Sequence, residues 1–258
     1  MKNKTISTFE KLRKSNRPNA KQYIDCIFED FIELSGDRIS GDDSSLIGGI
    51  GLLDNSPVTI IAQLRGNSFS EQIKYNYSMT LPEGFRKSLR LMKQAEKFRR
   101  PVICIVDTIG AFPGELAEMR GQSVAIANNI SELMYLKVPI ISILIGNGGS
   151  GGALALCIAD RVISLECAVL SVISPKACAT LLWKDASKEK KAFSLLKMTS
   201  SELQKVGIVD YIISESNGKV DRSISEIAIQ IKEYLINELN KLNKIGYKKL
   251  ISDRQKKY

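Results

Sequence analysis

One glycine-rich turn, Gly146-Asn147-Gly148-Gly149-Ser150-Gly151-Gly152-Ala153, constrains the possible folds of this chain more than any other feature. It follows the apolar stretch Val138–Ile145 and opens a run of small residues, which predicts that a buried strand ends there and a helix begins. Glycine tolerates positive φ and lets a ligand approach the peptide planes, and the first amides of a helix have no acceptor inside it. Such a turn is suited to bind an oxyanion.

This turn differs from the common phosphate-binding turns. A phosphate-binding loop continues with Gly-Lys-Ser/Thr, which is missing, and we do not expect an acidic residue at the end of a second strand, as the Rossmann turn requires. The amides are therefore expected to polarise a carbonyl or enolate oxygen. The alternative is a strand-to-helix turn that needs glycine for packing alone.

A second turn of the same character, Asp107-Thr108-Ile109-Gly110-Ala111-Phe112-Pro113-Gly114, ends the apolar stretch Pro101–Asp107. A helix-patterned segment, Ala117–Leu136, lies between the two turns, so strand, turn and helix occur twice in succession. This repeat predicts neighbouring parallel strands whose carboxyl ends meet at one edge of the sheet, where open α/β sheets bind ligands. We expect both turns at one site, with Asp107 fixing the first turn rather than acting as a base.

The composition is typical of a globular protein. With 258 residues, 44% hydrophobic and 25% charged, the chain is expected to form one layered α/β domain over residues 1–258, in which residues 1–17 are a loosely held basic arm. No apolar run reaches the length of a membrane span, and the N-terminus lacks the apolar segment of a signal peptide. We expect a cytoplasmic protein with no membrane partner.

The chain has no histidine, which removes Ser-His-Asp and Cys-His catalysis and histidine-based metal sites. Its five cysteines are widely spaced and form no Cys-x-x-Cys pair, so we interpret them as reduced core residues and expect no metal site. Chemistry must then use carboxylates, backbone amides or the substrate itself.

The net charge of +9 favours an anionic partner, such as coenzyme A or an acidic protein. Lysine and arginine are concentrated before Pro18, at Lys188–Lys197 and after Lys241, where a solvated basic surface is the alternative. The aromatic residues that alternate with basic ones in nucleic-acid-binding folds are missing, which argues against nucleic acid.

Periodicity and turn residues predict the remaining elements. We expect an amphipathic helix from Asn19 that ends at Gly36, then a hairpin, an irregular binding loop and a second helix before the glycine turns. The expected ranges are 46–53 and 57–64 for the hairpin, 66–81 for the loop, 82–98 for the second helix, 161–164, 168–172 and 208–213 for later strands, and 223–242 for a long final helix.

Five further motifs are spread over most of the chain: Ser35-Gly36-Asp37-Arg38, Pro82-Glu83-Gly84-Phe85-Arg86-Lys87, Ala117-Glu118-Met119-Arg120-Gly121-Gln122, Ser171-Val172-Ile173-Ser174-Pro175 and Gly207-Ile208-Val209-Asp210. Together with the glycine turns, they resemble the alpha subunit of bacterial acetyl-coenzyme A carboxylase carboxyltransferase in its shorter form. The resemblance implies a crotonase-like (ClpP/crotonase) ββα superhelix with flanking helices. It also implies transfer of a carboxyl group from carboxybiotin on a carrier protein to acetyl-coenzyme A, which gives malonyl-coenzyme A for fatty acid biosynthesis.

The same resemblance implies partners and cofactors. A beta subunit with a zinc ribbon would complete the enzyme, as two alpha and two beta subunits, and a biotin carboxyl carrier protein and a biotin carboxylase would belong to the complex. This chain would bind no cofactor covalently, with zinc only in the beta subunit. Carboxybiotin that loses carbon dioxide leaves a ureido anion able to remove the α-proton, which would account for the missing histidine.

Residue roles also follow from the resemblance. The catalytic groups would be backbone amides that stabilise the ureido oxygen. The expected site residues are Gly151 and Gly152 for these amides, Gly148, Gly149 and Ser150 for the shape of their turn, Gly110 and Ala111 for the opposite wall, and Arg120 for substrate binding. A brace to Glu118 and Asp107 is the alternative role of Arg120.

The chain departs from the family pattern where the site is expected. Asn147, Met119 and Lys176 stand where the family has glutamate, and Ile109 is also unusual. One alternative is therefore a divergent paralogue that serves as a non-catalytic scaffold or regulatory subunit, or that acts on another acyl-coenzyme A. A free-standing hydratase or isomerase is a further alternative, and it would need a carboxylate pair such as Glu115 and Glu118.

Overall fold

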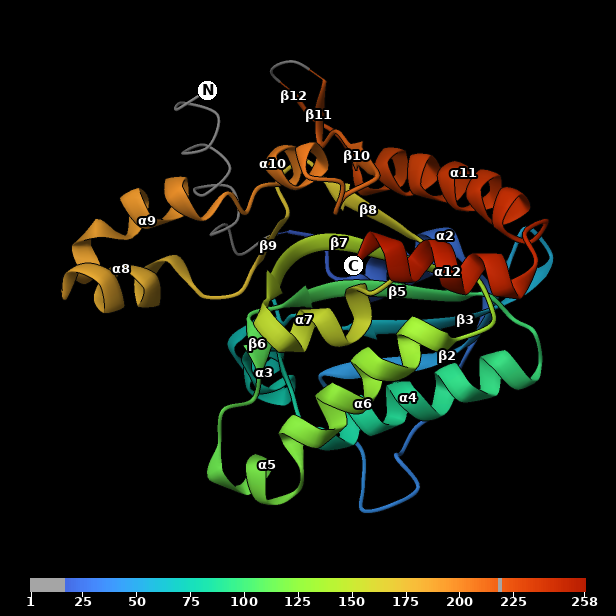
Figure 1. Ribbon diagram of the computed structural model, residues 1–258, viewed down its shortest axis with the longest axis horizontal. Coiled ribbons are helices and arrows are strands. Elements are labelled where there is room, and N and C mark those ends of the chain that lie inside the picture. The colour runs from blue at the N-terminus through green and yellow to red at the C-terminus, as the bar shows by residue number, and fades with distance from the viewer. Residues whose placement is uncertain (1–16, 218–219) are drawn as a thin grey trace.

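A mixed β-sheet forms the centre of the computed structural model, which describes residues 17–217 and 220–258 (Figure 1). Its strands follow the order β1-β2-β3-β5-β7-β8-β10. The first three are antiparallel neighbours, and the strands from β3 onward are parallel. The strand ranges are β1 Glu29–Glu33, β2 Leu46–Leu53, β3 Ser56–Gln63, β5 Val102–Thr108, β7 Ile140–Gly149, β8 Arg161–Leu165 and β10 Tyr211–Ile213.

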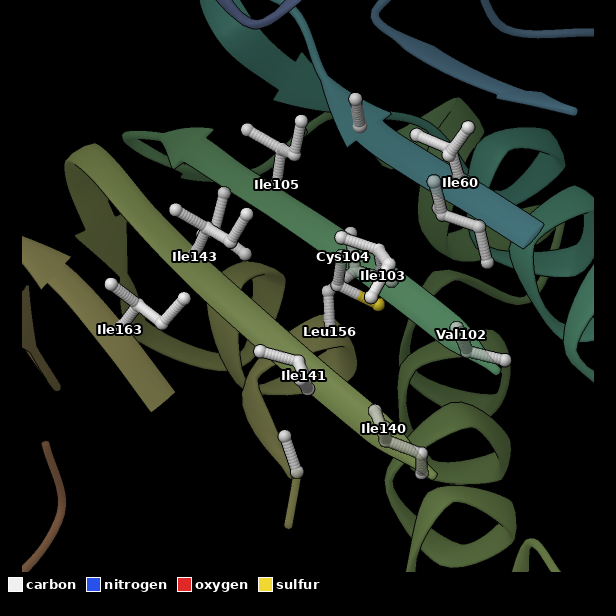
Figure 2. Close-up of a cluster of buried hydrophobic side chains, with 14 of the residues drawn as sticks. Ile60, Val102, Ile103, Cys104, Ile105, Ile140, Ile141, Ile143, Leu156 and Ile163 are labelled. Carbon is white, nitrogen blue, oxygen red and sulfur yellow. The ribbon is translucent and has the colours of Figure 1, made fainter. Parts of the chain in front are cut away.

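The parallel strands form the core because they are apolar on both faces, as strands covered on two sides must be. Every residue of β5 is buried. Figure 2 shows Ile60, Ile103 and Ile141 on β3, β5 and β7, and the strand register places these three side by side. Leu156 of helix α7 (Ser150–Cys157) belongs to the same cluster.

Helices cover both faces of the sheet (Figure 1). Helices α4 (Pro82–Lys97) and α6 (Gln122–Tyr135) lie on one face, and α7 packs between α6 and strands β5 and β7. Helices α2 (Ala20–Ile27) and α11 (Ile224–Leu242) pack together on the other face. The glycine turn that opens α7 is thus attached to a helix held against the centre of the sheet.

The C-terminal helix α12 (Tyr247–Lys257) packs against α6 and is anchored by a buried arginine. Arg254 pairs with Asp160 at 2.8 Å (Nη2 to Oδ2) and donates to three backbone carbonyls around the end of α6. The hydroxyl of Tyr258 donates to the carbonyl of Cys157 at 2.9 Å. The C-terminal segment therefore supports the far end of α7.

Short strands lie beside the glycine turns. Strand β4 (Met79–Thr80) pairs with β6 (Gly110–Ala111), and β9 (Val169–Ser171) pairs with the end of β7. Helices α8 (Pro175–Trp183) and α9 (Glu189–Leu196) then project from the body (Figure 1). The remaining elements are α3 Phe69–Lys74, η1 Asn76–Ser78, α5 Glu115–Met119, η2 Ala186–Lys188, α10 Ser200–Lys205, β11 Ser216–Asn217 and β12 Val220–Asp221.

Several predictions from the sequence are confirmed. They include the hairpin, the two successive strand-turn-helix units and the long helix over 223–242, although that helix is not the final one, because α12 follows it. All five cysteines are free thiols and four are buried, but Cys26 is exposed, so the interpretation as a core residue is wrong for Cys26. Within the described ranges, no helix has the length and apolar character needed to span a membrane.

The helix predicted from Asn19 to Gly36 is wrong in its second half. Helix α2 ends at Ile27, and Phe28 is extended with φ −111° and ψ 153°. Residues 29–33 then form an edge strand against β2. The apolar spacing alone is compatible with a helix, but the free edge of β2 offers this segment backbone hydrogen bonds and decides for a strand.

Two other predicted ranges differ in detail. The helix predicted over 117–136 is divided into α5 and α6 at Gly121, whose φ is 84°. The irregular loop predicted over 66–81 contains α3, which begins with a capping box formed by Ser68 and Glu71. The Ser-x-x-Glu pattern in the sequence signals this helix start.

Candidate functional site

The two glycine turns are neighbours because β5 and β7 are adjacent parallel strands, as predicted. The register places Val106 opposite Leu144 and Thr108 opposite Gly148. Residues 145–147 of β7 therefore lie opposite a single residue of β5, Asp107. Such a bulge bends a strand and increases its twist, and bulges are common beside active sites.

The Asp107 carboxylate binds this bulge. Its side chain is 2% exposed, Oδ1 accepts the N–H of Asn147 at 2.8 Å, and Oδ2 lies 3.5 Å from Nη2 of Arg17. Arg17 also donates to the carbonyl of Ile145 at 3.1 Å. Asp107 thus fixes the second turn, whereas the sequence pattern predicts that it fixes the first. Arg17 is held by the core, and the rest of the predicted arm lies outside the described residues.

The left-handed residue of the second turn is a serine. Ser150 has a φ of 51°, while the glycines between residues 146 and 152 all have φ outside the left-handed region. A non-glycine residue in this region costs roughly 1–2 kcal/mol, and such strain is often found at functional turns. The expectation that glycine serves here for positive φ is therefore wrong.

Glycine is instead required because the two turns pack backbone to backbone. A β-carbon added to Gly149 would lie 2.2 Å from the carbonyl oxygen of Ile109, and one on Gly152 would lie 2.6 Å from the nitrogen of Ala111. At Gly151 the nearest atom would be Cγ2 of Ile126 at 3.5 Å, an ordinary contact. Gly151 therefore has space that Gly149 and Gly152 lack.

The first turn does use glycine for its backbone conformation. Gly110 has a φ of 148°. The hydroxyl of buried Thr108 accepts the N–H of Gly110 at 3.1 Å and donates to the carbonyl of Ser78. These contacts fix the conformation of the first turn and attach it to the segment that contains Ser78.

The N-terminus of α7 has no side-chain cap. Gly149 is the N-cap residue, and the amides of Ser150, Gly151 and Gly152 have no acceptor inside the helix. The helix dipole adds partial positive charge at this end. Nε2 of Gln63 donates to the carbonyl of Gly152 at 2.9 Å and so fixes the orientation of that peptide. This end of α7 is a site for negative charge.

A cavity of about 130 Å³ lies at this end of α7. The second turn forms one wall, and β9 with the start of α8 forms the other. Its lining residues are Ile109, Asn147, Gly148, Gly149, Ser150, Val169, Ser171, Ile173, Ser174, Pro175 and Met198. The volume is below that of a typical pocket for a whole ligand, so it suits one small group.

The predicted site residues occupy different places relative to this cavity. Gly148, Gly149 and Ser150 line it, and Gly151 and Gly152 follow directly in α7. The other wall of the cavity is formed by Val169, Ser171, Ile173, Ser174, Pro175 and Met198. Gly110 and Ala111 do not form it, because their strand β6 is paired with β4 and packed against Gly152.

Arg120 follows helix α5 and is not among the residues that line the cavity. Its side chain is 48% exposed, Nη1 lies 3.4 Å from Oε1 of Glu83, and Nε donates to the carbonyl of Leu116. The predicted brace to Glu118 and Asp107 is therefore wrong, because α5 points Arg120 toward α4.

Of the four departures from the family pattern, Asn147 and Ile109 line the cavity, whereas Met119 and Lys176 are exposed. Sequence reasoning assigned no site role to the residues of the second wall. The signal was present, because Ser171-Val172-Ile173-Ser174-Pro175 is one of the motifs of the resemblance. Met198 had no signal in the sequence.

A dinucleotide site needs separate consideration. Gly146, Gly148 and Gly151 have the spacing of a Rossmann turn, and Glu166 follows β8, contrary to our expectation. The Glu166 carboxylate accepts the hydroxyl of Ser214 at 2.8 Å. The strand order along the described sheet never reverses, so it offers no switch point of the kind at which open sheets bind dinucleotides.

In the part of the chain that the structure describes, no group of three or more Cys, Asp or Glu side chains is arranged so that it could hold a metal ion.

Comparison with known proteins relates these features to a family. The model of the family described as "Acetyl co-enzyme A carboxylase carboxyltransferase-like" matches residues 4–258. The acetyl-coenzyme A carboxylase carboxyl transferase subunit alpha of Clostridium perfringens is 52% identical over 246 residues, which cover 95% of this chain and 91% of that protein. A Clostridium tetani protein named for subunits beta/alpha is 48% identical over 246 residues, which cover 95% of this chain and 43% of its own length.

A solved structure shares the fold. A chain of transcarboxylase 12S, determined with methylmalonyl-coenzyme A bound, superposes with a TM-score of 0.70 at 17% identity, over 87% of this chain and 43% of that chain. This similarity concerns the fold, and it confirms the predicted crotonase-like α/β architecture. Because the family model matches almost from end to end and the relatives are about half identical, this chain belongs to the acetyl co-enzyme A carboxylase carboxyltransferase-like family.

Proposed function

We propose that this chain is the alpha subunit of a carboxyltransferase that moves a carboxyl group from carboxybiotin, held on a carrier protein, to acetyl-coenzyme A. The observation that carries the proposal is the uncapped N-terminus of α7, which lies beside a small cavity. The first residues of this helix are Ser150, Gly151 and Gly152. The proposal is supported by relatives that are named as this subunit and that match this chain over most of their length.

The chain's own contribution is the stabilisation of negative charge on oxygen. The amides of Gly151 and Gly152 and the dipole of α7 act on an oxyanion at the cavity. Gln63, through the carbonyl of Gly152, and the packing of Gly152 on Ala111 hold the first turn of α7 in place before the substrate arrives, so little reorganisation is needed during the reaction. Biotin supplies the carboxyl group. After the carboxyl group has been released, biotin also supplies the base that removes the α-proton.

The cavity lining agrees with a reaction that uses no protein base. Among the described residues that form it, none is Asp or Glu. The carboxylates required by a hydratase or isomerase are elsewhere: Glu115 and Glu118 belong to α5, are exposed, and do not line the cavity. Glu118 instead accepts the hydroxyl of Ser123 at 2.7 Å.

A non-catalytic paralogue is the second candidate. It is favoured by Asn147, which lines the cavity and stands where the resemblance implies a glutamate. The packing of Gly149 and Gly152 serves the fold in either case, whereas the uncapped amides at the start of α7 favour the enzyme.

Partners follow from the surface beside the cavity. A beta subunit, which carries the zinc, completes the site in an assembly of two alpha and two beta subunits. Val172, Leu181, Leu182 and Leu195 around α8 and α9 are exposed apolar residues, a surface typical of protein contacts. The stretch 174–197 also has six lysines against two carboxylates, which favours an acidic carrier that brings carboxybiotin from a biotin carboxylase.

The test is malonyl-coenzyme A formation by the full chain with and without its beta subunit, supplied with carboxylated carrier. We expect no turnover from the chain alone and turnover from the assembled enzyme. Robust activity of the isolated chain would contradict the shared site. Inactivity of a correctly assembled complex would favour the paralogue.

A further inference from the structure

At the bulge of β7, side chains replace two hydrogen bonds of the β-ladder. The N–H of Asn147 donates to Oδ1 of Asp107 at 2.8 Å, and the carbonyl of Ile145 accepts Nη1 of Arg17 at 3.1 Å. The guanidinium and the carboxylate face each other at 3.5 Å. Both ends of the bulge are therefore bound to one ion pair.

This ion pair is buried directly beneath the bulge. The side chains of Arg17 and Asp107 are 10% and 2% exposed. A β-carbon added to Gly146, in the middle of the bulge, would lie 2.3 Å from Oδ1 of Asp107 and 2.5 Å from Nη2 of Arg17. The pair therefore packs closely against the backbone and restricts the conformation of Ile145–Asn147.

A second guanidinium acts on the same carboxylate. Arg65 follows β3, and burial lowers the pKa of its guanidinium. The charge of Asp107 opposes this shift, whereas the charge of Arg17 adds to it. Arg17 joins the carboxylate to the Ile145 carbonyl with two different nitrogens. A lysine would have to reach both groups with one ammonium nitrogen, whereas the guanidinium reaches each group with a nitrogen of its own.

We propose that Arg17 is a positioning residue for the glycine turn. Its guanidinium joins Asp107 to Ile145, fixes the bulge, and so sets the direction in which Ser150, Gly151 and Gly152 present their amides to the cavity. Arg17 itself is not among the residues that line the cavity. The inference rests on the proposed oxyanion function of α7.

The experiment uses the complete enzyme with its beta subunit and compares Arg17→Ala with wild type. We expect turnover to fall roughly 10- to 100-fold, as for small misplacements of catalytic groups, with the KM for acetyl-coenzyme A nearly unchanged. Added guanidinium ion should restore part of the turnover of Arg17→Ala. Amide hydrogen exchange at Asn147 should be faster in the variant, because its acceptor is no longer held.

Arg100→Ala is the matched control. Arg100 is also half-buried and donates to two side chains, Thr59 and Gln94, but it precedes β5, at the opposite end of that strand from Asp107. Turnover of Arg17→Ala close to that of Arg100→Ala would overturn the inference, as would a folded Arg17→Ala that guanidinium does not restore. If Arg17→Ala does not fold, Arg17→Lys replaces it. This variant keeps the charge but not the bridge, and wild-type turnover from it would also overturn the inference.

Gly151→Val, measured in parallel, separates the two hypotheses. A folded Gly151→Val enzyme with normal turnover would refute the oxyanion function and this inference with it. A strong loss in Gly151→Val together with normal turnover in Arg17→Ala would refute the role of Arg17 alone.

Discussion

Gly152 packs directly against the backbone of Ala111, where an added β-carbon would lie 2.6 Å from the amide nitrogen. The glycines of the second turn therefore differ in what they do. Gly149 and Gly152 let the two turns touch, whereas an added β-carbon on Gly151 would make only an ordinary contact with Ile126.

Substitutions at Gly152 and Gly151 should have different effects. Gly152→Ala should lower the free energy of unfolding by about 1–3 kcal/mol, because the methyl group is forced against the first turn. Gly151→Ala should stay within about 0.5 kcal/mol of wild type. Gly151→Val should fold and lower turnover by about 100-fold or more if the amide binds the oxyanion. Urea unfolding and turnover of the assembled enzyme measure these effects, and equal destabilisation by both alanine variants would contradict the packing argument.

Ser150 carries backbone strain that can be relieved. Ser150→Gly should raise the free energy of unfolding by up to about 1 kcal/mol, because glycine adopts a φ of 51° without a clashing β-carbon, although its greater freedom in the unfolded chain reduces the gain. Ser150→Val should be less stable than wild type, since a β-branched residue is poorly tolerated there. The thermal unfolding midpoints of the three proteins provide the measurement. A Ser150→Gly protein less stable than wild type would show that the hydroxyl group stabilises the turn.

The lysines of α8 and α9 should affect the carrier and not the acyl substrate. Lys176, Lys184 and Lys197 are exposed, so their replacement by glutamate should raise the KM for carboxylated carrier several-fold and leave the KM for acetyl-coenzyme A unchanged. The difference from wild type should shrink as salt rises, because exposed charges are screened. The control variant carries two substitutions at the end of α11, Lys241→Glu and Lys244→Glu. An equal effect of that control would show that net charge alone is responsible.

Asp37 should contribute to the dependence of stability on pH. Burial alone would raise the pKa of this carboxyl group, but hydrogen bonds from the amides of Gly41, Ile39 and Ser40 and from Arg86 hold it well below its usual range. Because the pKa is lower in the folded than in the unfolded state, the stabilisation is present above about pH 4 and is lost as pH falls below it. Between about pH 5 and pH 2, wild type should therefore lose stability more steeply than Asp37→Asn. Urea titrations across this range, with Asp25→Asn on the surface of α2 as control, measure the slopes, and parallel curves for wild type and Asp37→Asn would contradict this.

Family membership and the central strands could be predicted because they depend on local patterns. Strands β5 and β7 are continuous apolar runs, since both of their faces are covered, and each ends at a glycine turn. The edge strand β1 was mistaken for helix because its apolar spacing is ambiguous and the deciding hydrogen bonds come from β2. Helix α12 was missed because it is a polar helix with only two buried side chains, Leu250 and Arg254, and the partner of Arg254 is distant in sequence.

The sequence by itself determined that two glycine turns meet at the carboxyl ends of parallel strands, because residue type and spacing set those turns within short segments. Only the tertiary structure decided how the turns are held. Arg17 reaches the Ile145 carbonyl across 128 positions of the chain and Asp107 across 90. A pair so distant in sequence leaves no periodic signal, and burial beneath one bulge gives these two charges their role.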